Sequence, residues 1–188
     1  MNGIQGQIVT DQDLSNILTP GYWLNDLVIC HAQTILKQQF PKISGFQNTK
    51  DVYNSSLDRT AEYEKPSKGF VQILFNGKDH WVCTSNLIDG GKNVKIYDSM
   101  HSTCQNTIKK QLDVLVSPKS IISVEKVQSQ LENGQDNPNN RGLCGLFAIA
   151  FATSLCFGED PGARKYNTDG MRHHLYDCLR ARHMSKFP

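Results

Sequence analysis

The alternation of apolar and polar residues divides the chain into segments with helical and with extended periodicity. Apolar positions recur at helical spacing after Asn25 and Asp26, either of which can cap a helix, and Pro41 ends this segment. Three β-rich runs follow, at 70–75, 81–87 and 94–97. Because short turn sequences separate these runs, we expect an antiparallel meander.

The remaining segments are less uniform. Residues 42–69 are polar without a firm period, so we expect a loop with at most one short element. An amphipathic helix is indicated by the apolar positions of 108–116, and a further strand by 121–127. Thr168 can cap a final helix with apolar residues at helical spacing. The pattern therefore predicts a mixed α+β fold.

The most apolar segment runs from Cys144 to Phe157 and is hydrophobic almost all round. Such a helix is expected at the centre of the fold, and Gly158 can close it. A polar, turn-rich loop, residues 133–142, comes directly before it. Cys144 therefore stands where a solvated loop meets the first turn of a buried helix. Helix-start amides favour thiolate over thiol there, although a small buried hydrophobe is the alternative interpretation.

Length and composition narrow the class of protein. A chain of 188 residues with 38% hydrophobic content is expected to form one compact domain, residues 1–188. A net charge of +2 without basic runs argues against a nucleic-acid partner. No segment approaches the roughly 18 apolar residues of a membrane span, and the N-terminus does not resemble a signal peptide. We therefore expect an intracellular protein, cytoplasmic or nuclear, without membrane contact.

The six cysteines are widely scattered and include no Cys-x-x-Cys pair. Without a secretory signal, we expect reduced thiols and not disulfides. The spacings His80-x-x-Cys83 and His101-x-x-Cys104 suggest metal ligands at first sight. Residues three apart on a strand point to opposite faces, so we expect no metal site.

His80 and Asp98 could form a catalytic pair with Cys144. His80 opens one predicted strand and Asp98 follows another, 18 residues later. If the two strands pair as a hairpin, the start of one lies beside the end of the other, and Asp98 could orient the imidazole. Taken singly, a surface histidine and a turn-capping carboxylate would be the ordinary interpretations.

Four blocks, in this order along the chain, resemble the signature blocks of the ubiquitin-like-protein-specific cysteine proteases, which include the SUMO-deconjugating enzymes. The blocks are Trp23-Leu24-Asn25-Asp26, His80-Trp81, Tyr97-Asp98-Ser99 and Cys144-Gly145-Leu146-Phe147. The resemblance implies a permuted papain-like core of the adenovirus-protease-like clan. In that core a mixed β-sheet packs on a buried helix that starts at the nucleophile.

The resemblance also implies roles for individual residues. Cys144 would be the nucleophile, His80 the general base and acid, and Asp98 the residue that orients the histidine. Trp23 and Trp81 would clamp the thin Gly-Gly tail of the substrate. Ordinary core packing is the alternative for both tryptophans.

The chain departs from the family pattern at two positions. Leu143 stands where the family usually has aspartate, which leaves the main-chain amide of Cys144 unchanged. The family's oxyanion glutamine lies about six residues before the cysteine, and Pro138 occupies that position here. We favour Gln130 as the donor, because it continues the strand that normally delivers it. Gln135 is second, Gln128 is third, and a site without a side-chain donor is the remaining alternative.

The resulting prediction is a cysteine-type isopeptidase or endopeptidase that cleaves after the Gly-Gly of a ubiquitin-like modifier. SUMO is the leading modifier, followed by ubiquitin or another one. We expect a monomer without cofactor whose partners are the modifier and its conjugates. The alternatives are an adenovirus-like or mobile-element protease, a degenerate module that binds a modifier without cutting it, and an acetyltransferase.

Overall fold

The computed structural model describes residues 9–58, 63–66, 69–100, 104–116, 120–130 and 142–188, and it has an α+β fold. The helices are α1 Asp11–Ile17, α2 Asp26–Gln39, α3 Thr49–Asp58, α4 Asn106–Leu115, α5 Cys144–Cys156 and α6 Thr168–Ala181, with a 3-10 turn at Pro161–Ala163. The strands are β1 Ser44–Gly45, β2 Phe70–Phe75, β3 Trp81–Ser85, β4 Asn93–Tyr97 and β5 Ile121–Glu125.

The strands form a five-stranded mixed sheet in the order β1-β2-β3-β4-β5. The central strands β2, β3 and β4 pair antiparallel, which confirms the predicted meander. The two outer strands, β1 and β5, each pair parallel with their neighbour. The sheet is therefore a hairpin-connected centre with a parallel strand added at each edge.

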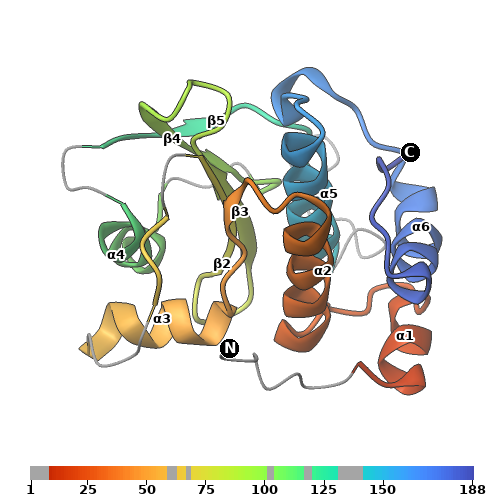
Figure 1. Ribbon diagram of the computed structural model, residues 1–188. Helices are drawn as coiled ribbons and strands as arrows, with labels where there is room; N and C mark the ends of the chain where they lie inside the picture. The colour runs from red at the N-terminus through yellow and green to blue at the C-terminus, as the bar shows by residue number, and fades with distance from the viewer. Residues whose placement is uncertain (1–8, 59–62, 67–68, 101–103, 117–119, 131–141) are drawn as a thin grey trace.

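Helices cover both faces of this sheet (Figure 1). α3 and α4 lie on one face, and α2 and α5 lie side by side on the other, with α1 and α6 outside them. The strands alternate between two apolar clusters, as their period of two requires. Val71 and Ile73 of β2 join the cluster around α5, whereas Phe70 and Leu74 join the cluster around α4.

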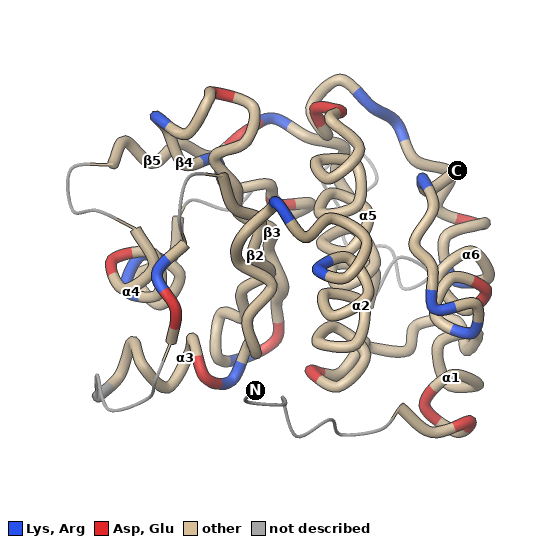
Figure 2. Tube along the Cα trace, in the orientation of Figure 1, with Lys and Arg blue, Asp and Glu red and all other residues tan. Residues whose placement is uncertain are grey.

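The central helix α5 is the most completely buried element. Every one of its residues, Cys144–Cys156, is buried, and none carries a charge (Figure 2). This confirms the prediction of a buried helix that begins at Cys144. Gly158 follows it with a φ of 76°, the left-handed conformation expected at the end of a helix.

Several element predictions needed correction. The polar stretch 42–69 contains the ten-residue helix α3. The residues before Pro20 contain α1, which their weak apolar pattern did not predict. The final helix is capped by Asn167, whose side chain accepts the Asp169 amide, and Thr168 is its first helical residue. Asn25 caps α2 by accepting the Val28 amide, so the choice between Asn25 and Asp26 is settled.

All six cysteines are free thiols. In the part of the chain that the structure describes, no helix is long and apolar enough to cross a membrane. The same residues contain no group of three or more His, Cys, Asp or Glu side chains that could hold a metal ion.

Candidate active site

Cys144 is the first residue of α5 and is 4% exposed. The N-cap residue is Leu143, whose side chain makes no capping hydrogen bond. Leu143, where the family usually has aspartate, is buried in the core directly before Cys144. Gly145 allows close approach to the Trp-Leu-Asn-Asp block, because a Cβ there would lie 3.0 Å from the Cβ of Leu24. The helix start therefore packs tightly against the segment that carries Trp23.

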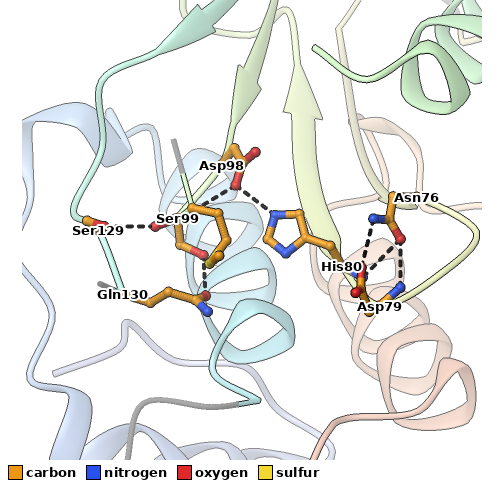
Figure 3. Close-up of polar contacts among 8 residues, drawn as sticks. Asn76, Asp79, His80, Asp98, Ser99, Ser129 and Gln130 are labelled. Carbon is orange, nitrogen blue, oxygen red and sulfur yellow. Dashed lines mark hydrogen bonds and ion pairs between the residues drawn. The ribbon is translucent and has the colours of Figure 1, made fainter. Parts of the chain in front are cut away.

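His80 and Asp98 lie together at one end of the β3–β4 hairpin (Figure 3). His80 Nε2 lies 2.7 Å from Asp98 Oδ1, and the two side chains are 9% and 3% exposed. The same carboxylate oxygen accepts the backbone amide of Met100 at 2.7 Å, which holds the carboxylate in place. The hairpin thus brings together the two residues that the sequence analysis paired.

The thiol of Cys144 lies near enough to the imidazole of His80 to affect its pKa. Burial lowers the pKa of His80, but hydrogen bonds with the side chains of Asp98 and Cys144 and the charges of both groups outweigh it. Together these effects raise the pKa of His80 to about 9. Because Asp98 occupies Nε2, the ring nitrogen left for Cys144 is Nδ1. A thiol, an imidazole and a carboxylate therefore stand in series, the arrangement that activates a thiol nucleophile.

The three candidate glutamines have different environments. Gln130 is buried, and its side-chain Oε1 accepts the hydroxyl of Ser99 at 2.7 Å. Its backbone amide donates to the Ser99 carbonyl at 2.9 Å. The Ser99 contact orients the Gln130 amide so that Nε2 points away from Ser99 (Figure 3). Gln128 is engaged elsewhere, because both ends of its amide bond the backbone of Tyr166. Gln135 lies outside the described residues.

Trp23 and Trp81 line the same cavity of about 450 Å³ but differ in exposure. Trp23 is 47% exposed, whereas Trp81 is 6% exposed and donates its indole N–H to the Leu24 carbonyl at 3.1 Å. Trp81 also packs on Phe75, with ring centroids 4.6 Å apart. Trp81 therefore packs in the core and also forms part of the cavity wall, whereas Trp23 forms the solvent-accessible part of that wall.

The sequence analysis missed residues that the structure adds to this region. Tyr53 and Phe75 line the cavity, and Ser99 orients Gln130. Tyr53 could not be placed because α3 had not been predicted. Ser99 could have been found from the sequence, because it directly follows Asp98 at the end of the predicted strand 94–97.

Comparisons with known proteins give matches in structure only. No family model and no curated protein matches the sequence. The C-terminal Ulp1 protease domain in complex with Smt3, the yeast ortholog of SUMO, superposes with a TM-score of 0.69 at 16% identity, covering 97% of this chain and 86% of that one. The Chaetomium thermophilum Ulp1-like SUMO protease catalytic domain gives 0.60 at 17% identity, covering 89% and 76%.

A further structure is the SUMO protease Ulp1 with its catalytic cysteine oxidised to a sulfenic acid. It gives a TM-score of 0.66 at 15% identity, covering 96% of this chain and 87% of that chain. At such identities the similarity establishes the architecture and not the chemistry. The resemblance noted in the sequence is thereby confirmed at the level of structure: the chain has the fold of the Ulp1-like SUMO proteases.

Proposed function

We propose that this chain is a cysteine-type isopeptidase or processing protease that cleaves after the C-terminal Gly-Gly of a ubiquitin-like modifier. SUMO is the leading modifier, and ubiquitin or another one comes second. The observation that carries the proposal is the position of His80, whose Nε2 lies 2.7 Å from Asp98 Oδ1 and whose imidazole is near enough to Cys144 for that thiol to help raise the pKa of His80. This contact is made at the start of a buried helix, where a thiolate is favoured.

The chemistry follows from these contacts. His80 holds the proton of the Cys144 thiol as imidazolium, and Cys144 Sγ attacks the carbonyl carbon of the terminal glycine while the C–O π electrons move to oxygen. As the C–N bond breaks, the imidazolium of His80 gives its proton to the leaving amine, and a thioester remains. His80 then takes a proton from water, which attacks the thioester. The C–S bond breaks, and the modifier leaves with a free carboxylate.

Two N–H donors would hold the negative oxygen of the tetrahedral intermediate. One is the backbone amide of Cys144, at the start of α5. The other is the side-chain amide of Gln130, whose orientation is set by the Ser99 hydroxyl. A donor fixed in this way needs no reorganisation during the reaction, which is what makes it effective.

The cavity supports a narrow substrate. Trp23 and Trp81 line it together with aromatic residues of α3 and β2, directly beside the strand end that carries His80. A diglycine tail has no side chains, so it can pass between the two tryptophans where a sequence with larger side chains would not fit. The Ulp1 domain with the same fold was solved with the modifier Smt3, which supports a modifier as the substrate class.

The proposed reaction also has consequences for the compartment, the cofactor requirement and the oligomeric state. The nucleophile must be a reduced thiol, which suits the cytoplasm or nucleus. The reaction uses no cofactor, and all the proposed groups come from one chain, so a monomer suffices.

The test is a panel of ubiquitin-like modifiers that carry C-terminal thiol-reactive warheads. We expect a covalent adduct with SUMO, absent in Cys144→Ala, and release of free modifier from an isopeptide-linked conjugate. An adduct with a different modifier would correct the substrate and keep the reaction. Binding without an adduct would indicate the non-cutting module, and cleavage restricted to internal glycine-containing peptides would indicate an adenovirus-like protease.

A further inference from the structure

The turn that precedes His80 is organised by one buried side chain, that of Asn76. Asn76 Oδ1 accepts three consecutive backbone amides, those of Lys78, Asp79 and His80, each at 2.9 Å. Figure 3 shows the bonds from Asp79 and His80. Asn76 Nδ2 donates to Asp79 Oδ1 at 3.2 Å. The backbone amide of Asn76 donates to the His80 carbonyl at 2.9 Å. The side-chain amide of Asn76 thus adds four hydrogen bonds to the main-chain bond that closes the turn.

These contacts begin where the strand ladder ends. Phe75 and Trp81 are the last paired residues of β2 and β3. Beyond that pair, both the amide and the carbonyl of His80 bond to Asn76. Asn76 and His80 are 8% and 7% exposed, so water has little access to replace these bonds. The backbone of His80 is therefore held mainly by Asn76.

The turn is also pressed against the cavity wall. Gly77 has a φ of 85°, and a Cβ there would lie 2.4 Å from the hydroxyl oxygen of Tyr53 on α3. Gly77, Lys78 and Asp79 themselves line the cavity. Any change in the turn would consequently move both this wall and the imidazole that follows it.

We propose that Asn76 is a positioning residue: through its three amide contacts it holds His80 where the imidazole reaches Asp98 and Cys144 together. The inference rests on the proposed function for its biological meaning. The position of His80 relative to Cys144, which the inference concerns, can be measured without any modifier. Small displacements suffice, since misplacement by about 1 Å can cost on the order of a hundredfold in rate.

The test compares three variants of the full chain. Asn76→Ala removes the acceptor. The double variant Asn76→Asp with Asp79→Asn keeps an oxygen acceptor for the three amides and reverses the direction of the side-chain bond between positions 76 and 79. Asn86→Ala is the matched control: Asn86 is also buried and accepts a backbone amide, that of Phe70 at 2.9 Å, at the other end of β3.

The main readout is the pH dependence of Cys144 alkylation by iodoacetamide, followed by mass spectrometry. In Asn76→Ala we expect the rate of Cys144 alkylation near neutral pH to fall about tenfold, because the imidazole no longer lies where it can take the thiol proton. The double variant should recover the parental profile. Asn86→Ala should lower the unfolding midpoint and leave the profile unchanged. The ¹⁵N shifts of the His80 imidazole should change in Asn76→Ala alone.

The outcomes separate positioning from stability. If Asn76→Ala unfolds more easily but keeps the parental profile, as the Asn86 control does, the proposal is overturned. A folded double variant that does not recover the profile also overturns it. If Asn76→Ala does not fold, Asn76→Ser, whose hydroxyl can accept fewer amides, should show an intermediate profile, and a parental profile there counts against the proposal. Failure of every modifier probe on a parent whose profile still depends on Asn76 would overturn the proposed function and leave this inference standing.

Discussion

The described part of the chain brings a cysteine thiol against a histidine ring in two places, and the two pairs lie at opposite ends of their helices. Cys144 starts α5 and lies near His80, which precedes β3, so that it affects the pKa of this histidine. Cys178 lies in the last turn of α6, with its Sγ 3.5 Å from Nε2 of His174, one turn earlier on the same helix. The helix dipole favours negative charge at the start of a helix, where Cys144 lies, and positive charge at the end, where Cys178 lies.

The two histidines also differ in which ring nitrogen is left to face the thiol. Nε2 of His174 lies 3.1 Å from the Ser185 carbonyl oxygen, which can only accept, so this nitrogen must be the donor. It is the same nitrogen that faces Cys178, and it therefore cannot take the thiol proton. His80 instead directs Nε2 to Asp98 and leaves Nδ1 for Cys144. The comparison teaches that proximity of thiol and imidazole is insufficient: the partner on the other ring nitrogen decides the role.

The largest effect should separate the two cysteines. We expect a modifier probe to label only Cys144, and Cys144→Ala to abolish turnover while the fold persists. Cys178→Ala should keep the parental rate. Burial raises the pKa of Cys156 to about 12 and that of Cys83 well above its usual range, so neither offers a thiolate. Mass spectrometry that places the adduct on any thiol other than Cys144 would contradict the assignment.

Substitutions of the two histidines should differ almost as much in their effect on turnover. His80→Gln removes the general base and acid, a contribution on the order of a hundredfold to ten-thousandfold, and should bring turnover near background. His174→Gln should leave turnover at the parental level, because no reacting group depends on it. Steady-state rates on purified variants decide between them. Loss in His174→Gln with retention in His80→Gln would reverse the comparison.

Asp98 is the feature that the second pair lacks. Asp98→Asn should cost about a hundredfold, less than His80→Gln, because it disturbs orientation and charge but leaves the imidazole in place. The contact with Asp98 helps to raise the pKa of His80 to about 9, so its loss lowers that pKa. The imidazolium is then lost at a lower pH, and the alkaline limb of kcat/KM should move to lower pH. An unmoved limb would show that Asp98 does not set the charge state of His80.

The glutamines give a contrast of the same kind. Gln130→Ala should lose activity on the order of a hundredfold, and Gln128→Ala less than about tenfold, because only Gln130 would be a fixed oxyanion donor. Gln128→Ala should instead lower stability, since both of its bonds to the Tyr166 backbone are removed. Gln135→Ala is also expected to lose less than about tenfold. A large loss confined to Gln135→Ala would move the assignment to that residue.

Much of this arrangement could be predicted from the sequence. The hairpin that joins His80 to Asp98 follows from period-two runs separated by turn residues, and α5 follows from its uniform apolarity. α1 was missed although Thr10 and Asp13 form a capping box, a local signal that the weak apolar pattern obscured. The turn before His80 was predicted as a turn, but the three amides that Asn76 accepts could not be, because such contacts depend on the conformation itself.

The second thiol–imidazole pair shows the same limit. The spacing of His174 and Cys178 predicts neighbours on one helix face. The return of the chain that brings Ser185 and Phe187 against His174 is a tertiary contact, which no local pattern contains. Which nitrogen of His174 carries the proton could therefore not be predicted.

The smallest expected effects concern the tryptophans, which test whether the cavity beside His80 is a substrate channel. Trp23 is 47% exposed, so Trp23→Ala should change the unfolding midpoint little. The variant should lower kcat/KM on folded conjugates about tenfold, because the tail is positioned less well. Trp81→Ala should also reduce cleavage, but it should lower stability by about 3–5 kcal/mol because the side chain is buried. Phe157→Ala is the control, an aromatic residue 36% exposed just after α5. Equal rates for Trp23→Ala, Phe157→Ala and the parent would show that the exposed tryptophan does not contact the tail, while the thiol chemistry at Cys144 would be unaffected.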